Sequence, residues 1–264
     1  MKNNPIGILD SGSGGLTVCK EVVRVLPDES VVYIADSKNI PYGEKSSEEI
    51  FVLAKNLIKF LLSKRAKIIV IACNTITVSC LDDLRKEFSD IPIVGTVPVI
   101  KKAAEITKNK RVGIFSTTKT AESNYQKVLI QRFAQDCTIT TVGSDEIVPL
   151  IEAGKAQGQD MKNVLERVLT PFKDAEIDTL CLGCTHFPII ENDIQEILGK
   201  EVILLEPSSA IARHTKKILM HNNEISDELN KKYTFYTTGD SRQFETVAKS
   251  LLQDTIRAEH VDLK

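Results

Sequence analysis

Residues 67–73 read KIIVIAC, and residues 178–184 read DTLCLGC. Each stretch is a continuous apolar run of strand length that ends in a cysteine, and helical patterns lie on both sides of it. Apolar strands between helices are typical of a parallel sheet that is covered on both faces. The two stretches therefore predict an α/β fold in which two similar strands end in two similarly placed cysteines.

Three more pairs of expected strands recur at nearly the same separation. Residues 5–10 match 111–116, residues 31–35 match 138–142, and residues 93–98 match 202–207, with offsets of 106, 107 and 109 residues. Similar offsets along the chain predict two pseudo-symmetric parallel-sheet α/β domains, built as two copies of one unit. A single doubly wound sheet, in which any two strands look alike, is the alternative.

One further strand, residues 232–238, and a helix from about residue 241 are expected after the second copy. We expect this last part of the chain to return to the first copy. The first domain is then discontinuous, with residues 1–97 plus 208–264, and the second domain covers residues 98–207. Ligands of open parallel sheets bind beyond the carboxyl ends of the strands, so the active site is expected in the cleft between the domains.

The composition and the net charge argue against some classes of binding partner. The chain has 264 residues, 42% of them hydrophobic, and a net charge of −2, so no strong field attracts nucleic acid or anionic lipid. No signal-peptide pattern and no uncharged run of membrane-spanning length is found. We therefore expect a cytoplasmic protein with a small-molecule partner and reduced cysteines, and neither a nucleic acid nor a membrane partner.

The segment GCTHFP (183–188) invites two readings. Cys181 and Cys184 form a C-x-x-C with His186 close by, which suggests a metal site or a redox pair. However, Cys181 lies inside an apolar strand, where buried cysteine is ordinary core. Zinc held by Cys73, Cys184, His186 and Asp10 remains an alternative, although structural zinc usually takes its ligands in close pairs. If the two copies face each other, Cys73 and Cys184 can face each other across the cleft.

The loop SGSGG (11–15) resembles part of a dinucleotide-binding fingerprint, and Asp36 lies at a suitable distance beyond it. Thr17 stands where the third glycine belongs, and Asp10 would repel a pyrophosphate. The helix starts after the strands suit a smaller anion, such as a carboxylate. Asn74, Thr75 and Thr185 would add donors there, or serve as N-caps, or both.

Four motifs in this order resemble the glutamate racemases of the cofactor-independent aspartate/glutamate racemase superfamily: DSGSGG (10–15), PYG (41–43), ACNT (72–75) and GCTHFP (183–188). The resemblance runs from the first strand to TTGD (237–240). Aspartate racemases typically carry Glu where His186 stands, which favours glutamate. The superfamily's two-domain α/β fold, with the site between the domains, agrees with the duplication.

The resemblance implies conversion of L-glutamate to D-glutamate for peptidoglycan precursors, and so a part in cell wall biogenesis and cell shape, by a homodimer that needs no cofactor and no metal. Cys73 and Cys184 would be the acid/base pair, with Cys73 deprotonating the D enantiomer and Cys184 the L enantiomer. Asp10 and His186 would assist the thiols, and Glu152 would have an auxiliary part in catalysis. The implied substrate-binding residues are Asp10, Ser11, Tyr42, Gly43, Asn74, Thr75, Thr117, Thr120 and Thr185.

The match at Thr117 and Thr120 is looser, because Ser116 stands where glycine is common. Asp36 matches a recurrent family acid and also suits a strand-end cap. The remaining cysteines and histidines are assigned no function: Cys19, Cys80 and Cys137 are expected to pack in helices or strands, and His214, His221 and His260 to lie on the surface. A racemase of aspartate or another amino acid, and a non-catalytic amino-acid-binding protein of the same fold, remain the alternatives.

Overall fold

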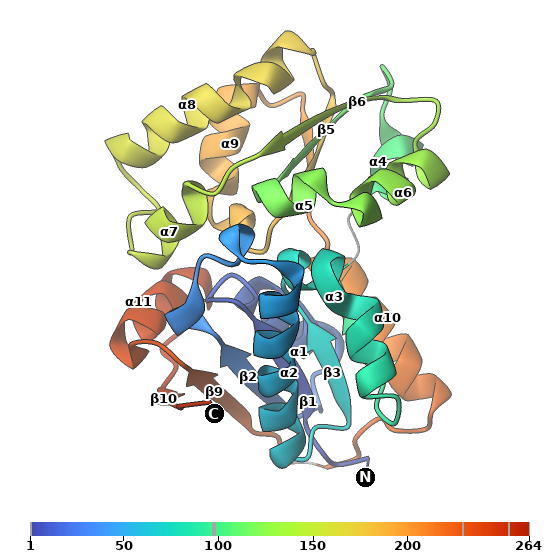
Figure 1. The fold of residues 1–264 in the computed structure, drawn as a ribbon, viewed down its shortest axis with the longest axis vertical. Coiled ribbons are helices and arrows are strands. Elements are labelled where there is room, and N and C mark those ends of the chain that lie inside the picture. The colour runs from blue at the N-terminus through green and yellow to red at the C-terminus, as the bar shows by residue number, and fades with distance from the viewer. Residues whose placement is uncertain (1, 97–98, 229, 253, 264) are drawn as a thin grey trace.

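The computed structural model describes residues 2–96, 99–228, 230–252 and 254–263. Within these residues the chain forms two parallel sheets, each flanked by helices, in two lobes stacked one above the other (Figure 1). The predicted α/β class and the duplicated parallel sheets are thus confirmed. The first predicted domain boundary falls at residues 97–98, which lie outside the described residues, and the exact division into domains stays a prediction.

The first sheet has the strand order β10-β9-β2-β1-β3-β4. Its strands are β1 (Ile6–Asp10), β2 (Val31–Ala35), β3 (Ile68–Ile71), β4 (Ile93–Gly95), β9 (Tyr233–Thr237) and β10 (Ala258–His260). One face is covered by α1 (Leu16–Val25), α10 (Ser208–His221) and α11 (Ser241–Leu252), and the other by α2 (Ser47–Ser63) and α3 (Asn74–Glu87). The last part of the chain therefore adds β9 and β10 to the first sheet, as predicted for residues 232–238.

The second sheet has the order β6-β5-β7-β8, with β5 (Arg111–Ser116), β6 (Thr138–Gly143), β7 (Thr179–Gly183) and β8 (Ile203–Leu205). Its helices are α4 (Ile100–Ile106), α5 (Thr118–Glu122), α6 (Asn124–Phe133), α7 (Ile147–Glu152), α8 (Gln159–Asp174) and α9 (Glu191–Leu198). This order repeats β2-β1-β3-β4 of the first sheet. Each predicted strand pair occupies equivalent places in the two sheets, so the carboxyl ends of β3 and β7 are equivalent positions.

Local chemistry explains where several helices begin. Helix α2 starts at a capping box, in which the Ser46 side chain accepts from the Glu49 N–H and the Glu49 side chain accepts from the Ser46 N–H. Helix α3 begins at Asn74, directly after the end of the strand segment, with Cys73 at the N-cap position. Strand β10 is short and mostly exposed, and its sequence carries no β pattern that reveals it.

Helix α11 belongs to both lobes. Its Phe244 and Ala248 pack in the core beneath the first sheet, whereas Val247 packs with the apolar residues of α7 and α8. Figure 1 shows α11 directly below α7, at the junction of the lobes. Short 3₁₀ turns also meet there: η1 (Ser37–Asn39), η2 (Tyr42–Glu44) and η3 (Phe187–Ile190).

Candidate active site

The two cysteines that follow β3 and β7 line one cavity between the lobes. Cys73 is 4% exposed and Cys184 is 6% exposed, and the cavity has a volume of only about 20 Å³, room for about one water molecule. Its lining residues are Ser11, Pro41, Tyr42, Gly43, Cys73, Asn74, Thr75, Thr117, Asp145, Val148, Cys184, Thr185 and His186. Three residues expected at the site from sequence do not line the cavity themselves: Asp10, Thr120 and Glu152.

The surroundings of Cys73 are neutral or negative. Its Sγ lies 3.5 Å from the Ser11 hydroxyl, and the Asp10 carboxylate is close enough to repel a thiolate. Burial, followed by the charge of Asp10, raises the pKa of the Cys73 thiol to about 12. This thiol therefore holds its proton firmly while the cavity is without a substrate.

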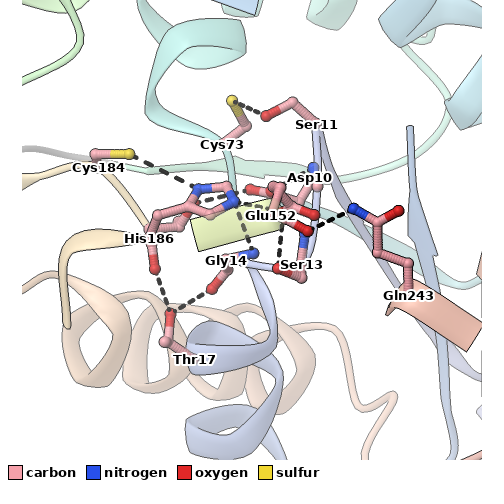
Figure 2. Close-up of polar contacts among 12 residues, drawn as sticks. Asp10, Ser11, Ser13, Gly14, Thr17, Cys73, Glu152, Cys184, His186 and Gln243 are labelled. Atoms are coloured by element: carbon pink, nitrogen blue, oxygen red, sulfur yellow. Dashed lines mark hydrogen bonds and ion pairs between the residues drawn. The ribbon is translucent and has the colours of Figure 1, made fainter. Parts of the chain in front are cut away.

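Cys184 has a basic partner instead. Its Sγ lies 3.9 Å from Nδ1 of His186, and Nε2 of the same ring lies 2.6 Å from Oε1 of Glu152 (Figure 2). Burial lowers the pKa of His186, but the contacts with Cys184 and Glu152 outweigh it and raise the pKa well above its usual value. Burial opposes the lowering of the Glu152 pKa, yet the hydrogen bonds from His186 and Ser13 prevail and lower it. The result is a buried carboxylate–imidazolium pair next to one thiol.

The glycine-rich loop after β1 packs against the Glu152–His186 pair. The Ser13 N–H and hydroxyl both donate to Oε1 of Glu152, at 2.6 and 2.7 Å. A Cβ on Gly12 would collide with the Glu152 carboxylate, and a Cβ on Gly14 would collide with the His186 ring. The glycines of SGSGG thus admit side chains from the second lobe, and Thr17 donates to the Gly14 carbonyl at 2.9 Å. The loop therefore accommodates protein side chains, where its pattern suggests the binding of a phosphate.

Asp10 reaches across the cleft. Its carboxylate accepts from the Gly12 N–H at 2.8 Å and from the Thr185 hydroxyl at 3.2 Å. Burial raises its pKa to about 6, although the nearby His186 charge acts to lower it. Among the described residues Asp10 has no hydrogen bond to Cys73, so any assistance it gives that thiol acts through charge.

Donors for a carboxylate gather on the other side of the cavity. The Thr75 and Thr117 hydroxyls lie 3.0 Å apart across the lobes, and Thr117 donates to Thr120 at 3.0 Å. Both side-chain polar atoms of Asn74 are buried and have no hydrogen-bond partner among the described residues. Asn74 is not an N-cap, because that position belongs to Cys73. Unpaired buried amide atoms are costly, and a bound ligand would satisfy them.

The PYG segment forms the remaining wall. Tyr42 donates its hydroxyl to Asp36 at 2.6 Å, and Thr238 donates to the same carboxylate at 2.6 Å. Asp36 therefore orients Tyr42 and holds Thr238, the residue that follows β9. The Gly43 backbone lies against Asp145, leaving no room for a Cβ.

Sequence reasoning missed Asp145 and Val148 as cavity residues. Asp145 comes two residues after the end of β6, and the rule that sites gather beyond strand ends could have found it. Cys181 is fully buried in the core, and His214, His221 and His260 are exposed, as expected. Cys137, expected to pack in a helix or strand, lies half-buried in the bend before β6. Within the described ranges, no three His, Cys, Asp or Glu side chains are grouped closely enough to hold a metal. In the same ranges, no helix has the length and apolar character needed to cross a membrane.

The class of protein follows from comparison with known sequences. The family model described as Asp/Glu/hydantoin racemase matches residues 6–215. A glutamate racemase of Lactobacillus acidophilus is 39% identical over 99% of this chain and 98% of its own length, and one of Clostridium perfringens is 37% identical over 96% and 98%. The chain belongs to the Asp/Glu/hydantoin racemase family.

Solved structures support the same assignment. Glutamate racemase from Bacillus anthracis has a TM-score of 0.89 at 34% identity, covering 100% of this chain and 99% of that one. The enzyme from Francisella tularensis, solved in complex with D-glutamate, has a TM-score of 0.88 at 34% identity, with the same coverage. An aspartate racemase from Picrophilus torridus, at 21% identity and a TM-score of 0.57, shares the fold.

Proposed function

We propose that this protein interconverts L- and D-glutamate without a cofactor or a metal. The observation that carries the proposal is the pair of buried thiols, Cys73 and Cys184, at equivalent strand ends and on one cavity. Full-length similarity to glutamate racemases, one of them solved with D-glutamate, supports glutamate as the substrate. A non-catalytic binding protein would need neither thiol.

Racemisation requires a base on one face of the α-carbon and an acid on the other. In one direction Cys184 as thiolate removes the α-proton of L-glutamate, and Cys73 as thiol protonates the opposite face to give the D enantiomer. The roles are exchanged in the reverse direction. A free cysteine with a pKa of about 8.5 is only ~3% thiolate at neutral pH. The imidazolium of His186, 3.9 Å from Sγ of Cys184, is placed to stabilise negative charge on the sulfur that acts as base.

Stabilising the carbanion is the larger obstacle, because an α-proton is far less acidic than a thiol. Fixed donors on the substrate carboxylates, supplied by Asn74, Thr75, Thr117 and Thr185, would lower its energy in a cavity that excludes water. Thr120 holds Thr117, Asp36 orients Tyr42, and Ser11 and Gly43 complete the wall. The unpaired amide of Asn74 is the donor and acceptor most clearly available to a ligand.

Asp10 lies beside the first helix start, where a substrate ammonium would balance its charge. An ammonium bound there would also offset the repulsion that Asp10 exerts on a Cys73 thiolate. A cavity of about 20 Å³ does not admit glutamate, so the lobes must separate for entry and close again over the substrate.

A chiral assay tests the function directly. Purified protein is given L-glutamate or L-aspartate, with no pyridoxal phosphate or nicotinamide, and both enantiomers are quantified. We expect D-glutamate to form much faster than D-aspartate, and exhaustive chelation to leave the rate unchanged. Loss of activity on chelation with recovery on adding a metal, or racemisation of aspartate alone, would overturn the proposal.

In the cell, D-glutamate made by this reaction would supply peptidoglycan precursors and so support the cell wall and cell shape. The reaction would take place in the cytoplasm, and the working form would be a homodimer. Growth of a D-glutamate-requiring bacterium that expresses this chain tests the first point. The molar mass in solution, measured by light scattering, tests the last.

A further inference from the structure

Asp145 lines the substrate cavity, and the two-thiol reaction does not use it. The described lining contains one carboxylate, that of Asp145, and one cation, the imidazolium of His186, which is engaged by Cys184 and Glu152. Glutamate carries two carboxylates and a net charge of −1. A second negative charge on the wall of its cavity therefore needs a reason.

The contacts of Asp145 leave its charge without a cationic partner. Its Oδ1 accepts from the Thr118 N–H at 3.2 Å, and the carboxylate lies against the Gly43 backbone of the other lobe. Among the described residues it forms no ion pair with a lysine, arginine or histidine. Lys119, next to Thr118, lines a separate recess between α2, α3, α5 and α6.

The structural contacts of Asp145 do not require the charge. Helix α5 packs against β6 in its own lobe and against η2 of the first lobe (Figure 1), and the Thr118 N–H that Asp145 accepts lies at this junction. An asparagine has the same shape, and its side-chain oxygen accepts the same hydrogen bond. The negative charge is therefore the property of Asp145 that acts on a ligand and not on the fold.

The positions of the two thiols orient the substrate. Its α-carbon has to lie between Cys73 and Cys184, because one thiol serves each face. Asn74 and Thr185 directly follow these cysteines, so their donors flank the α-carbon and suit the α-carboxylate. Asp10 suits the ammonium. The side chain of the substrate then extends toward the rest of the lining.

That remaining part of the lining forms a distal subsite, made of Tyr42, Gly43, Thr117, Asp145 and Val148. Val148 offers apolar surface to the methylene groups, and the Thr117 hydroxyl offers a hydrogen bond to the group at the end of the side chain. The distal carboxylate of glutamate would therefore lie beside the carboxylate of Asp145. This placement rests on the proposed function.

We propose that Asp145 determines the selectivity of the distal subsite, because its carboxylate opposes a distal carboxylate and accepts hydrogen bonds from a distal amide. Two like charges repel strongly in a closed cavity from which water is excluded. The amide of glutamine carries two N–H donors, and a hydrogen bond to a carboxylate is stronger than one to a neutral acceptor. Asp145 thus weakens the binding of glutamate and narrows the difference in affinity between glutamate and glutamine.

Initial rates on Asp145→Asn test this selectivity. We expect the KM for both enantiomers of glutamate to fall several-fold and kcat to change little, because the substitution removes repulsion at the distal end and leaves the α-carbon untouched. L-Glutamine is tested as a competitive inhibitor of the same preparations. The ratio of its inhibition constant to the KM for L-glutamate should rise several-fold in Asp145→Asn.

Glu146→Gln is the matched control, because it makes the same change of net charge one residue further along. Glu146 is exposed, pairs with Arg167 and does not line the cavity, so the KM and the ratio should stay as in the unmodified protein. Asp145→Ala separates removed repulsion from an added amide donor. It should also lower the KM for glutamate, since it removes the charge and adds no donor.

Several results would overturn the inference. An unchanged or higher KM for glutamate in Asp145→Asn is one, and an equal fall in Glu146→Gln, which would be an effect of net charge alone, is another. Parallel changes for glutamate and glutamine would show that Asp145 only supports the structure. A lower KM in Asp145→Asn but not in Asp145→Ala, or no inhibition of the unmodified protein by L-glutamine, would also contradict it. Absence of any racemisation by the unmodified protein would instead reject the proposed function.

Discussion

The two halves of the cavity are alike in backbone and opposite in charge. Cys73 and Cys184 follow equivalent strands of duplicated sheets, yet Cys73 faces a hydroxyl and a carboxylate, whereas Cys184 faces an imidazole tied to a carboxylate. Burial and Asp10 raise the pKa of Cys73 to about 12, while the contacts of His186 favour its protonated form beside Cys184. The two thiols thus occupy equivalent positions and differ in their neighbours, a negative charge near Cys73 and a positive one near Cys184.

The loop after β1 connects the surroundings of the two thiols. That loop belongs to the first lobe, but its Ser13 and the space left by its glycines receive Glu152 and His186 of the second. Asp10 of the first lobe likewise binds Thr185 of the second. The groups nearest each thiol lie in its own lobe, Ser11 beside Cys73 and His186 beside Cys184, and closure of the lobes adds the contacts of Ser13 with Glu152 and of Asp10 with Thr185.

The largest expected effect comes from removing either thiol. Cys73→Ala and Cys184→Ala should each lower racemisation of glutamate by about 10²–10⁴-fold or more, because each removes the acid/base group of one face. Both cysteines lie at the cavity and not in mid-core, so far-ultraviolet circular dichroism and the melting temperature should stay close to those of the unmodified protein. Retention of substantial racemase activity by either variant would contradict the assignment of one acid/base thiol to each half of the cavity.

The assisting groups should have smaller and unequal effects. His186→Asn removes the imidazolium beside Cys184, and with it the positive charge that stabilises negative charge on that sulfur. Conversion of L-glutamate, measured by initial rates, should suffer more than conversion of D-glutamate. Asp10→Asn should slow both directions to different degrees. Rates close to the unmodified protein in both directions, for both variants, would mean that these groups only support the structure.

The buried charge of Asp10 should also lower the free energy of unfolding at neutral pH. Burial raises its pKa from the usual 3.8 to about 6, so the ionised carboxylate opposes folding, and the cost grows as the pH rises from about 4 to about 6. The difference between these two pKa values corresponds to a destabilisation of at most about 3 kcal/mol above pH 6. Asp10→Asn should therefore unfold at a higher urea concentration than the unmodified protein at pH 7, with the gain vanishing near pH 4. A loss of stability at pH 7 would contradict the assigned charge state.

The smallest effect is expected at Cys181, which shares a C-x-x-C with Cys184 but lies fully buried in the core of the second lobe. Cys181→Ala should destabilise the fold by about 1 kcal/mol and keep most of the racemase activity. Activity as low as that of Cys184→Ala would restore the metal or redox interpretation of that motif. Activity and urea denaturation are measured on the same preparation.

Much of this architecture could be predicted from the sequence because strand periodicity and strand-end residues are local signals. The offset between KIIVIAC and DTLCLGC was enough to place Cys73 and Cys184 at equivalent positions. Which charges surround each thiol depends on contacts between residues far apart in the chain, such as His186 with Glu152, 34 residues apart, and Glu152 is held in turn by Ser13, 139 residues away. No local pattern encodes those contacts, and the glycines that permit them look the same as a phosphate-binding loop.

Other misses have equally physical reasons. Strand β10 is held by pairing with β9 and by no alternation of its own, so the residues Ala258–His260 give no sign of it. The sequence suggests Asn74 as an N-cap, but it is the first residue of α3, because Cys73 before it occupies the N-cap position. Asp145 has no recognisable motif and is marked only by its place after a strand.

Racemisation in deuterated water, analysed at low conversion by mass spectrometry of the separated enantiomers, tests the two-thiol account most directly. If Cys73 and Cys184 act from opposite faces, the product receives a solvent-derived deuteron from one thiol while the substrate proton stays on the other. The product enantiomer should then carry deuterium at the α-carbon, and the remaining substrate almost none, in both directions. Product formed largely without deuterium would mean that one base serves both faces, and would contradict the account even if both cysteines proved essential.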